Sequence, residues 1–247
     1  MNLTNLNVEN NLKFKMYFLE KMNLTLRINF CIFTTISKLD KKMLKINTRN
    51  KIIIFISFFA TLTAIGAYLK IPLPHIPITL QTFFVIMSGN LLGFKFGFIS
   101  QLLYLTVGLL GIPVFAYGGG PGYIFQPTFG YLLGYPFCAF TIGMLLKLFF
   151  AKFEIMNISK VKAFLLFFVS DITGLIVIFI FGLAYLYINL KLGLYFRLDQ
   201  LASANFDWDD TLTTAVMIFI PIDFVKAFLA SWLMVSLRKL PIFPVAS

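Results

Sequence analysis

Residues 112–134, IPVFAYGGGPGYIFQPTFGYLLG, are the stretch on which the interpretation of the whole chain depends. Apolar segments flank it on both sides, yet it holds four glycines within residues 118–122 and three prolines, which disfavour regular helix through its middle. Backbone without helical hydrogen bonds cannot face lipid, so such a segment either lies in water or lines a cavity inside the protein. The sequence therefore predicts a loop here, which is either an exposed turn or one wall of a binding site.

This loop contains candidate ligand-binding positions. Adjacent glycines let a backbone approach a ligand closely, and this makes Gly119 and Gly120 candidates. Tyr123 follows them, with Tyr117 and Phe125 nearby, and such rings offer flat apolar surfaces. The hydroxyl of Tyr123 adds a polar tip that can donate or accept a hydrogen bond.

The composition indicates a polytopic, all-α membrane protein. Of the 247 residues, 59% are hydrophobic and only 13% are charged, which is too apolar for a soluble domain. No charged or Pro/Gly-rich linker divides the apolar part, so residues 51–240 are predicted to form one membrane domain. Residues 1–50 are a basic, polar N-terminal extension, interpreted as a disordered tail, a surface-lying helix or an artefact of start-site choice with Met43 as the first residue.

Positive charge is concentrated near the ends of the apolar segments. The formal net charge is +11, and residues 1–50 contribute +6 of it, from nine Lys/Arg against three acidic residues. A basic chain can indicate a nucleic-acid partner, but this distribution favours contact with anionic membrane lipid, and we expect no nucleic acid.

Six apolar segments predict six transmembrane helices. Their approximate limits are 52–69, 78–93, 96–111, 127–147, 163–190 and 211–237. In a six-span arrangement, Lys51, Lys95, Lys147 and the pair Arg238 and Lys239 all fall on one side. The positive-inside rule then places both termini in the cytoplasm of a cell and the glycine-rich loop, between helices 3 and 4, outside the plasma membrane.

The chain lacks the residues of an enzyme or a metal protein. Its two cysteines, Cys31 and Cys138, and its single histidine, His75, cannot complete a tetrahedral metal site, so no metal is expected. We also find no nucleophile–base set and no G-x-x-x-x-G-K-[S/T] phosphate loop. The sequence therefore predicts a protein that is not an enzyme, needs no cofactor and cannot hydrolyse ATP itself.

Two charges interrupt the last apolar segment, within FIPIDFVKAFLA. A charge at the centre of a membrane helix costs ~2.5–3.5 kcal/mol, so Asp223 and Lys226 should avoid lipid. Three residues apart, they share one helix face, and Pro221 favours a kink beside them. They either line a polar cavity or form a neutralised pair that only orients the helix. Asp171 is a third intramembrane charge, hypothesised to compete with Asp223 for Lys226.

Small residues recur at four-residue spacing within the apolar segments. This spacing places each pair on one helix face and permits close helix approach. The pairs serve either packing inside the chain or docking of another membrane subunit. They are Ala60 and Ala64, Gly89 and Gly93, and Gly130 and Gly134.

Three blocks of sequence carry a resemblance to a known family. IPLPHIPITLQTFFVIMSGNLLG (71–93), GIPVFAYGGGPGYIFQPTFGYLLG (111–134) and IPIDFVKAFL (220–229) are similar to the BioY family, the biotin-specific substrate-binding (S) component of energy-coupling factor (ECF) transporters. The resemblance implies a six-helix bundle that binds biotin at its extracellular face. It further implies partners: a transmembrane coupling protein and two ATPase subunits, which use the ATP.

The resemblance also implies roles for individual residues. Asp223 and Lys226 would contact biotin, and the glycine-rich loop would close over it. Ala60 and Ala64 would dock on the coupling protein. Independently, a buried Asp can accept from the ureido N–H groups of biotin, and Gln81 can bond either way. The residues leave open which end of biotin meets Lys226, whether another small vitamin is the ligand, and whether the chain transports biotin alone.

Overall fold

The computed structural model describes residues 48–71, 78–126, 128–152, 158–191 and 208–237. Contacts divide the chain into two units, Met1–Lys51 and Ile52–Ser247, and the described helices belong to the second from residue 52 onward. The N-terminal extension, apart from residues 48–50, lies outside the described residues, as do Cys31 and His75. The described part contains five helices long and apolar enough to cross a membrane. They are α3 (Thr48–Tyr68), α4 (Gln81–Leu109), α5 (Phe129–Lys152), α6 (Lys160–Lys191) and α8 (Trp208–Leu237).

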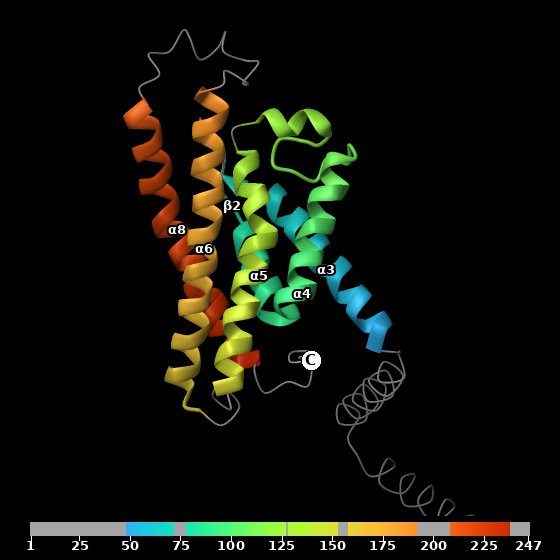
Figure 1. Ribbon diagram of the computed structural model, residues 1–247, viewed down its shortest axis with the longest axis vertical. Coiled ribbons are helices and arrows are strands. Elements are labelled where there is room, and N and C mark those ends of the chain that lie inside the picture. Colours follow the sequence, from blue (N-terminus) through green and yellow to red (C-terminus); the bar gives the residue numbers. More distant parts are fainter. Residues whose placement is uncertain (1–47, 72–77, 127, 153–157, 192–207, 238–247) are drawn as a thin grey trace, which may run out of the picture. The chain divides into compact units, whose positions relative to one another are not determined.

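Helix α4 reverses direction at Gly93, as Figure 1 shows. Gly93 has φ 72°, a left-handed conformation that glycine adopts without steric cost. Across the reversal, Gln101 Nε2 donates to Ser88 Oγ at 3.0 Å and Gln81 Nε2 donates to Tyr104 OH at 2.6 Å. In an unbroken helix these pairs would lie roughly 20 and 35 Å apart along the axis. Residues 81–92 and 94–109 are therefore antiparallel halves, and they overlap the predicted segments 78–93 and 96–111.

Glycines permit close packing between the helices. A Cβ on Gly89 would lie 2.9 Å from the carbonyl oxygen of Ala139 in α5. A Cβ on Gly134 in α5 would lie 2.9 Å from the Cα of Ile178 in α6. These glycines therefore serve packing inside the chain, the first of the two alternatives for the four-residue spacing.

Ala60 and Ala64, the predicted docking pair in α3, both contact the chain's own core. Ala60 is only 8% exposed and belongs to the chain's own core, and Ala64 is partly buried against that core. The structure thus favours internal packing for Ala60. Docking through this pair stays a prediction, because no partner is present to test it.

The distribution of polar and apolar side chains is that of a membrane protein. Large apolar side chains are exposed on every long helix, as at Phe58, Ile99, Phe140, Ile180 and Trp232. Several polar side chains are instead buried between the helices and bonded to one another. This arrangement fits a lipid solvent, in which polar groups must be satisfied internally.

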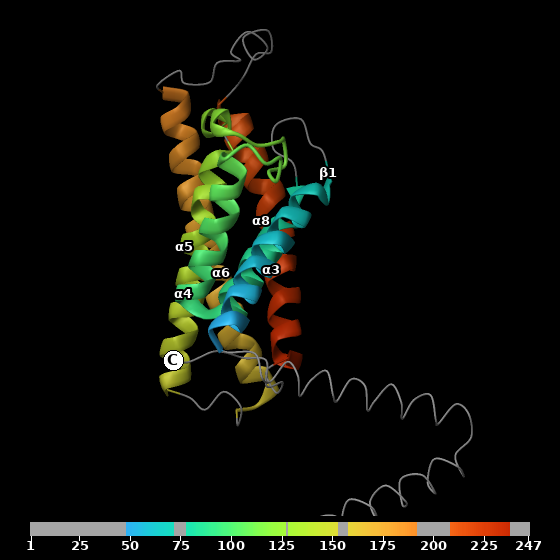
Figure 2. The ribbon, with the colours of Figure 1, turned by 90° about the vertical axis from the view of Figure 1, so that its right-hand side faces the viewer.

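Two short strands and the loop after α4 lie next to each other at one end of the helices. Strand β1 (Lys70–Ile71) pairs antiparallel with β2 (Ile78–Thr79), with Lys70 opposite Thr79. Residues 110–126 follow α4 and include the 3-10 helix η1 (Pro121–Phe125). Tyr68 OH donates to the carbonyl of Pro113, and Lys70 Nζ donates to that of Ala116. These bonds hold the 110–126 segment beside β1, as Figure 2 shows.

Candidate ligand-binding site

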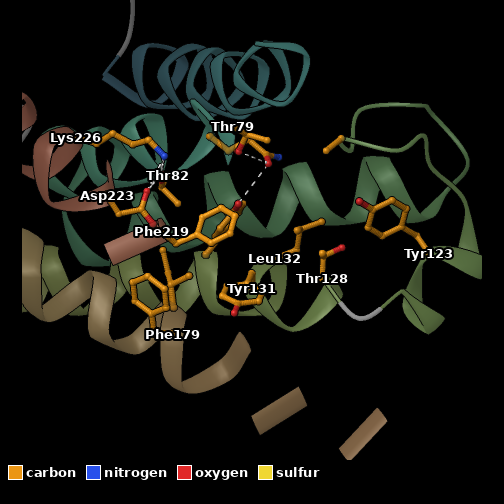
Figure 3. Close-up of a pocket in the computed structure, with 14 residues that line it drawn as sticks. Thr79, Thr82, Tyr123, Thr128, Tyr131, Leu132, Phe179, Phe219, Asp223 and Lys226 are labelled. Carbon is orange, nitrogen blue, oxygen red and sulfur yellow. Dashed lines mark hydrogen bonds and ion pairs between the residues drawn. The ribbon is translucent and has the colours of Figure 1, made fainter. Parts of the chain in front are cut away.

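A pocket lies between the first half of α4, helices α5, α6 and α8, and the 110–126 segment (Figure 3). It holds about 580 Å³ of space not filled by atoms, part of it open to solvent. The lining residues divide into a polar group at one end, an aromatic and aliphatic wall, and residues near the loop. They are Thr79, Gln81, Thr82, Ala116, Tyr123, Thr128, Tyr131, Leu132, Tyr135, Ile178, Phe179, Phe219, Asp223 and Lys226.

Three side chains form a bonded group at one end of the pocket, called here the polar cluster: Thr82, Asp223 and Lys226. Lys226 Nζ donates to Asp223 Oδ1 at 2.6 Å and to Thr82 Oγ1 at 2.9 Å. The Thr82 hydroxyl in turn donates to the same Oδ1 at 2.9 Å. Asp223 and Lys226 are 4% and 7% exposed, so both charges are buried and neutralise each other.

The polar cluster keeps unused hydrogen-bonding capacity. A carboxylate offers two oxygens, and among the described residues both bonds to Asp223 end on Oδ1, which leaves Oδ2 for a ligand donor. An ammonium has three N–H groups, and Lys226 uses two of them on the described residues. The cluster can therefore accept one N–H and donate to one carbonyl oxygen of a neutral polar molecule.

Gln81 lies at the start of α4 and connects several elements around the pocket. Its Oε1 accepts from Thr79 Oγ1 at 3.0 Å and from Tyr135 OH at 3.4 Å. Its Nε2 donates to Tyr104 OH, which donates in turn to the carbonyl of Val114 at 3.1 Å. Gln81 is 2% exposed, so this network fixes its amide at the pocket surface.

Tyr123 lines the end of the pocket away from the polar cluster, as Figure 3 shows. Its ring packs against Phe115, with ring centroids 4.6 Å apart. Burial raises the pKa of Tyr123 above its ordinary value of 10.0. At neutral pH the hydroxyl therefore keeps its proton and can donate a hydrogen bond.

Between these two ends the pocket surface is largely apolar. The rings of Tyr131, Tyr135, Phe179 and Phe219 contribute to it, with Leu132 and Ile178. Rings and branched side chains of this kind bind flat apolar groups. The pocket thus combines a polar end with a wall that suits a flat apolar group or an alkyl chain.

The structure brings together four of the six residues predicted to bind a ligand: Gln81, Tyr123, Asp223 and Lys226. Gly119 and Gly120 do not line this pocket. The N–H of Gly120 donates to the carbonyl of Gly108 at 2.8 Å, so this glycine stabilises the loop from the side of α4.

Asp171 is buried outside the pocket. Its Oδ1 accepts from Asn90 Nδ2 at 2.9 Å and its Oδ2 accepts from Ser231 Oγ at 2.7 Å. The carboxyl group therefore connects α4, α6 and α8. Lys226 is bonded to Asp223 and Thr82 instead, so this structure contains no sign of the hypothesised competition between Asp171 and Asp223.

The fold and the pocket define a class: a helical membrane protein with a pocket for a small molecule, at one end of which lies a buried polar cluster without net charge. The particular family follows from comparison with known proteins. The model of the BioY family matches residues 38–241, and the chain belongs to this family.

Named relatives and a solved structure agree with this assignment. The chain is 45% identical to the probable biotin transporter BioY of Lysinibacillus sphaericus, over 58% of this chain and 67% of that protein. It is 30% identical to the biotin transporter BioY of Thermotoga maritima, over 74% of this chain and 94% of that protein. Its fold is similar to the crystal structure of the S-component for biotin from an ECF-type ABC transporter, with a TM-score of 0.60, 28% identity, and coverage of 79% of this chain and 94% of that one.

Proposed function

We propose that this chain binds biotin and is the substrate-binding component for biotin uptake across the cell membrane. The observation that carries the proposal is the polar cluster, in which Thr82, Asp223 and Lys226 are buried together in a pocket with an aromatic wall. The family and the names of the relatives agree with it.

The pocket suits the chemical groups of biotin. A ureido ring carries two N–H donors and one carbonyl acceptor, so one N–H can reach Asp223 Oδ2 while the carbonyl accepts the free N–H of Lys226. The apolar sulfur ring then packs among Tyr131, Phe179 and Phe219. Biotin should be recovered chemically unchanged after binding, because the pocket surface carries no nucleophile–base pair among its described residues.

For uptake, the chain works with a transmembrane coupling protein and two ATPase subunits. No phosphate loop occurs in its sequence, so ATP is bound and hydrolysed by the partners and the chain itself needs no cofactor. Similarity to an S-component of an ECF-type ABC transporter supports this division of labour.

In the membrane, the two halves of α4 act as separate short spans, which with the other four helices give six. The halves are about 18 and 24 Å long at ~1.5 Å per residue, so the bilayer is locally thin beside them. Lys95 follows the reversal and Lys147 lies near the end of α5, and the positive-inside rule puts both on the cytoplasmic side. Both termini are then cytoplasmic, and the 110–126 segment covers the pocket from outside.

Titration calorimetry on the purified chain tests the ligand. Biotin is expected to bind with one-to-one stoichiometry, whereas riboflavin and thiamine, tested as alternative vitamins, are expected to give no heat. Tighter binding of either competitor would assign the pocket to another vitamin. Uptake by vesicles that contain only this chain separates the solitary transporter from the S-component, since full ATP-independent uptake would contradict the need for partners.

Thr82→Val removes the hydroxyl of the polar cluster at nearly constant side-chain volume. Lys226 then loses one acceptor and Asp223 one donor, and the pair is less rigidly oriented for the ureido group. We expect biotin affinity to fall by about tenfold, the value of roughly one hydrogen bond to a charged group. Calorimetry measures the change, and Thr106→Val, on an exposed face of α4, serves as the control. If Thr82→Val and wild type bound biotin with equal affinity, the Thr82 hydroxyl would not contribute to the binding site.

A further inference from the structure

A lysine stands beside the outer end of the pocket, where the partly exposed residues Thr79 and Ala116 form what is called here the mouth. Lys70, in β1, pairs with Thr79 in the strand register. Its Nζ donates to the carbonyl of Ala116 and lies 4.8 Å from the ring centroid of Tyr117. Figure 2 shows β1 beside the segment that carries Ala116.

The charge of Lys70 differs from that of Lys226 in its surroundings. Lys226 is buried and neutralised by Asp223. Lys70 is exposed, and within the described ranges it contacts a carbonyl oxygen and an aromatic ring but forms no ion pair. Among the described residues, the positive charge at the mouth thus has no acidic partner, while the inner end of the pocket has no net charge.

This contrast fixes where an anionic group can bind at lowest cost. A carboxylate placed against the polar cluster would bring a third charge into a buried, already neutral pair, and desolvation of that unpaired charge is expensive. At the mouth the same carboxylate keeps part of its water and meets an ammonium group. Within the described part of the chain, two N–H groups of Lys70 remain after the bond to Ala116, so a charge-assisted hydrogen bond is available.

We propose that Lys70 recognises the carboxylate of bound biotin, so that the ureido ring lies at the polar cluster and the acyl chain points toward the 110–126 segment. The assignment rests on the proposed function and deepens it, because it gives the ligand a direction. It makes Lys70 a specificity-determining residue that distinguishes acids from their neutral derivatives.

A neutral analogue separates recognition of the carboxylate from mere tethering of the loop. Biotinamide keeps the ring system and the chain but carries no charge. Its affinity should therefore depend on the position of the 110–126 segment but not on the charge of the Lys70 ammonium group. The experiment measures dissociation constants of biotin and biotinamide for wild type, Lys70→Gln and Lys70→Arg. Lys95→Gln is the matched control, since this exposed lysine lies 5.7 Å from the ring of Phe94, next to the reversal in α4.

Wild type is expected to prefer biotin over biotinamide by about tenfold, in the range of a partly exposed charge-assisted pair. Lys70→Gln should remove this preference by weakening biotin alone, Lys70→Arg should keep it, and Lys95→Gln should leave both affinities unchanged. Equal weakening of both ligands by Lys70→Gln would show a tether instead, and unchanged affinities for both ligands would show no role; either result overturns the assignment. If the wild-type protein bound neither biotin nor biotinamide, the proposed function itself would be rejected.

Discussion

Asp223→Asn is expected to lower the affinity of the purified chain for biotin by about 100-fold, because a ligand N–H loses its charged acceptor, at a cost of roughly 2–3 kcal/mol. The substituted amide also presents N–H groups where the carboxylate had only acceptors. Calorimetry with biotin measures the effect. Size-exclusion chromatography and thermal unfolding must accompany it, since the variant leaves Lys226 buried without its anionic partner.

Asp171→Asn provides the matched control for a buried intramembrane carboxyl group. Asp171 is fully buried like Asp223, but it bonds to Asn90 and Ser231 and does not line the pocket. We expect this variant to unfold at a lower temperature and to bind biotin with near wild-type affinity. If it weakened biotin as strongly as Asp223→Asn, the ligand would lie at a different place.

Gly119→Ala is expected to open the loop and to weaken biotin by at least tenfold. A Cβ at this position would lie 2.2 Å from the carbonyl oxygen of Ile112, and a backbone atom cannot rotate away as a side chain can. The loop must therefore shift, and with it Ala116 and Tyr123, which line the pocket. Faster dissociation of labelled biotin from the variant would report the change directly.

Gly122→Ala tests whether this effect is specific to the crowded position. A Cβ on Gly122 meets nothing within 4 Å, and this glycine is not among those with positive φ. Its biotin dissociation rate should stay within about twofold of wild type, as for surface substitutions that change stability little. Similar rates for the two alanine variants would mean that the loop does not retain the ligand.

The charged end of the pocket could be predicted because a charge in an apolar segment is a strong signal. Asp223 and Lys226 stand in a run that hydrocarbon side chains otherwise fill, and their spacing alone places them on one face. Tyr123 was predicted as an aromatic residue beside the glycines of the loop, and Gln81 as an amide able to hydrogen-bond biotin once the resemblance had been stated. A change of direction near Gly93 was expected because one predicted segment ends at residue 93 and the next begins at residue 96.

Other features carry no signal in the sequence. The chain has 31 phenylalanines and 10 tyrosines, so nothing distinguishes Phe179 or Tyr131, which line the pocket, from rings that face lipid. The sequence marked Asp171 as an intramembrane charge but not the direction of its side chain, so its partners Asn90 and Ser231 were missed. Two-residue strands such as β1 have no periodicity to detect, so the pairing that places Lys70 opposite Thr79 comes from the structure alone.

Joint replacement of the ion pair, Asp223→Asn with Lys226→Met, tests most directly whether the buried pair is the biotin site. Removing both charges together leaves none of them unpaired, so the fold should persist with a thermal midpoint near that of wild type. The expected result is a folded, monodisperse protein whose affinity for biotin has fallen by about 100-fold or more, from the loss of two hydrogen bonds to charged groups. A dissociation constant within about threefold of wild type, less than one such bond contributes, would contradict the assigned site.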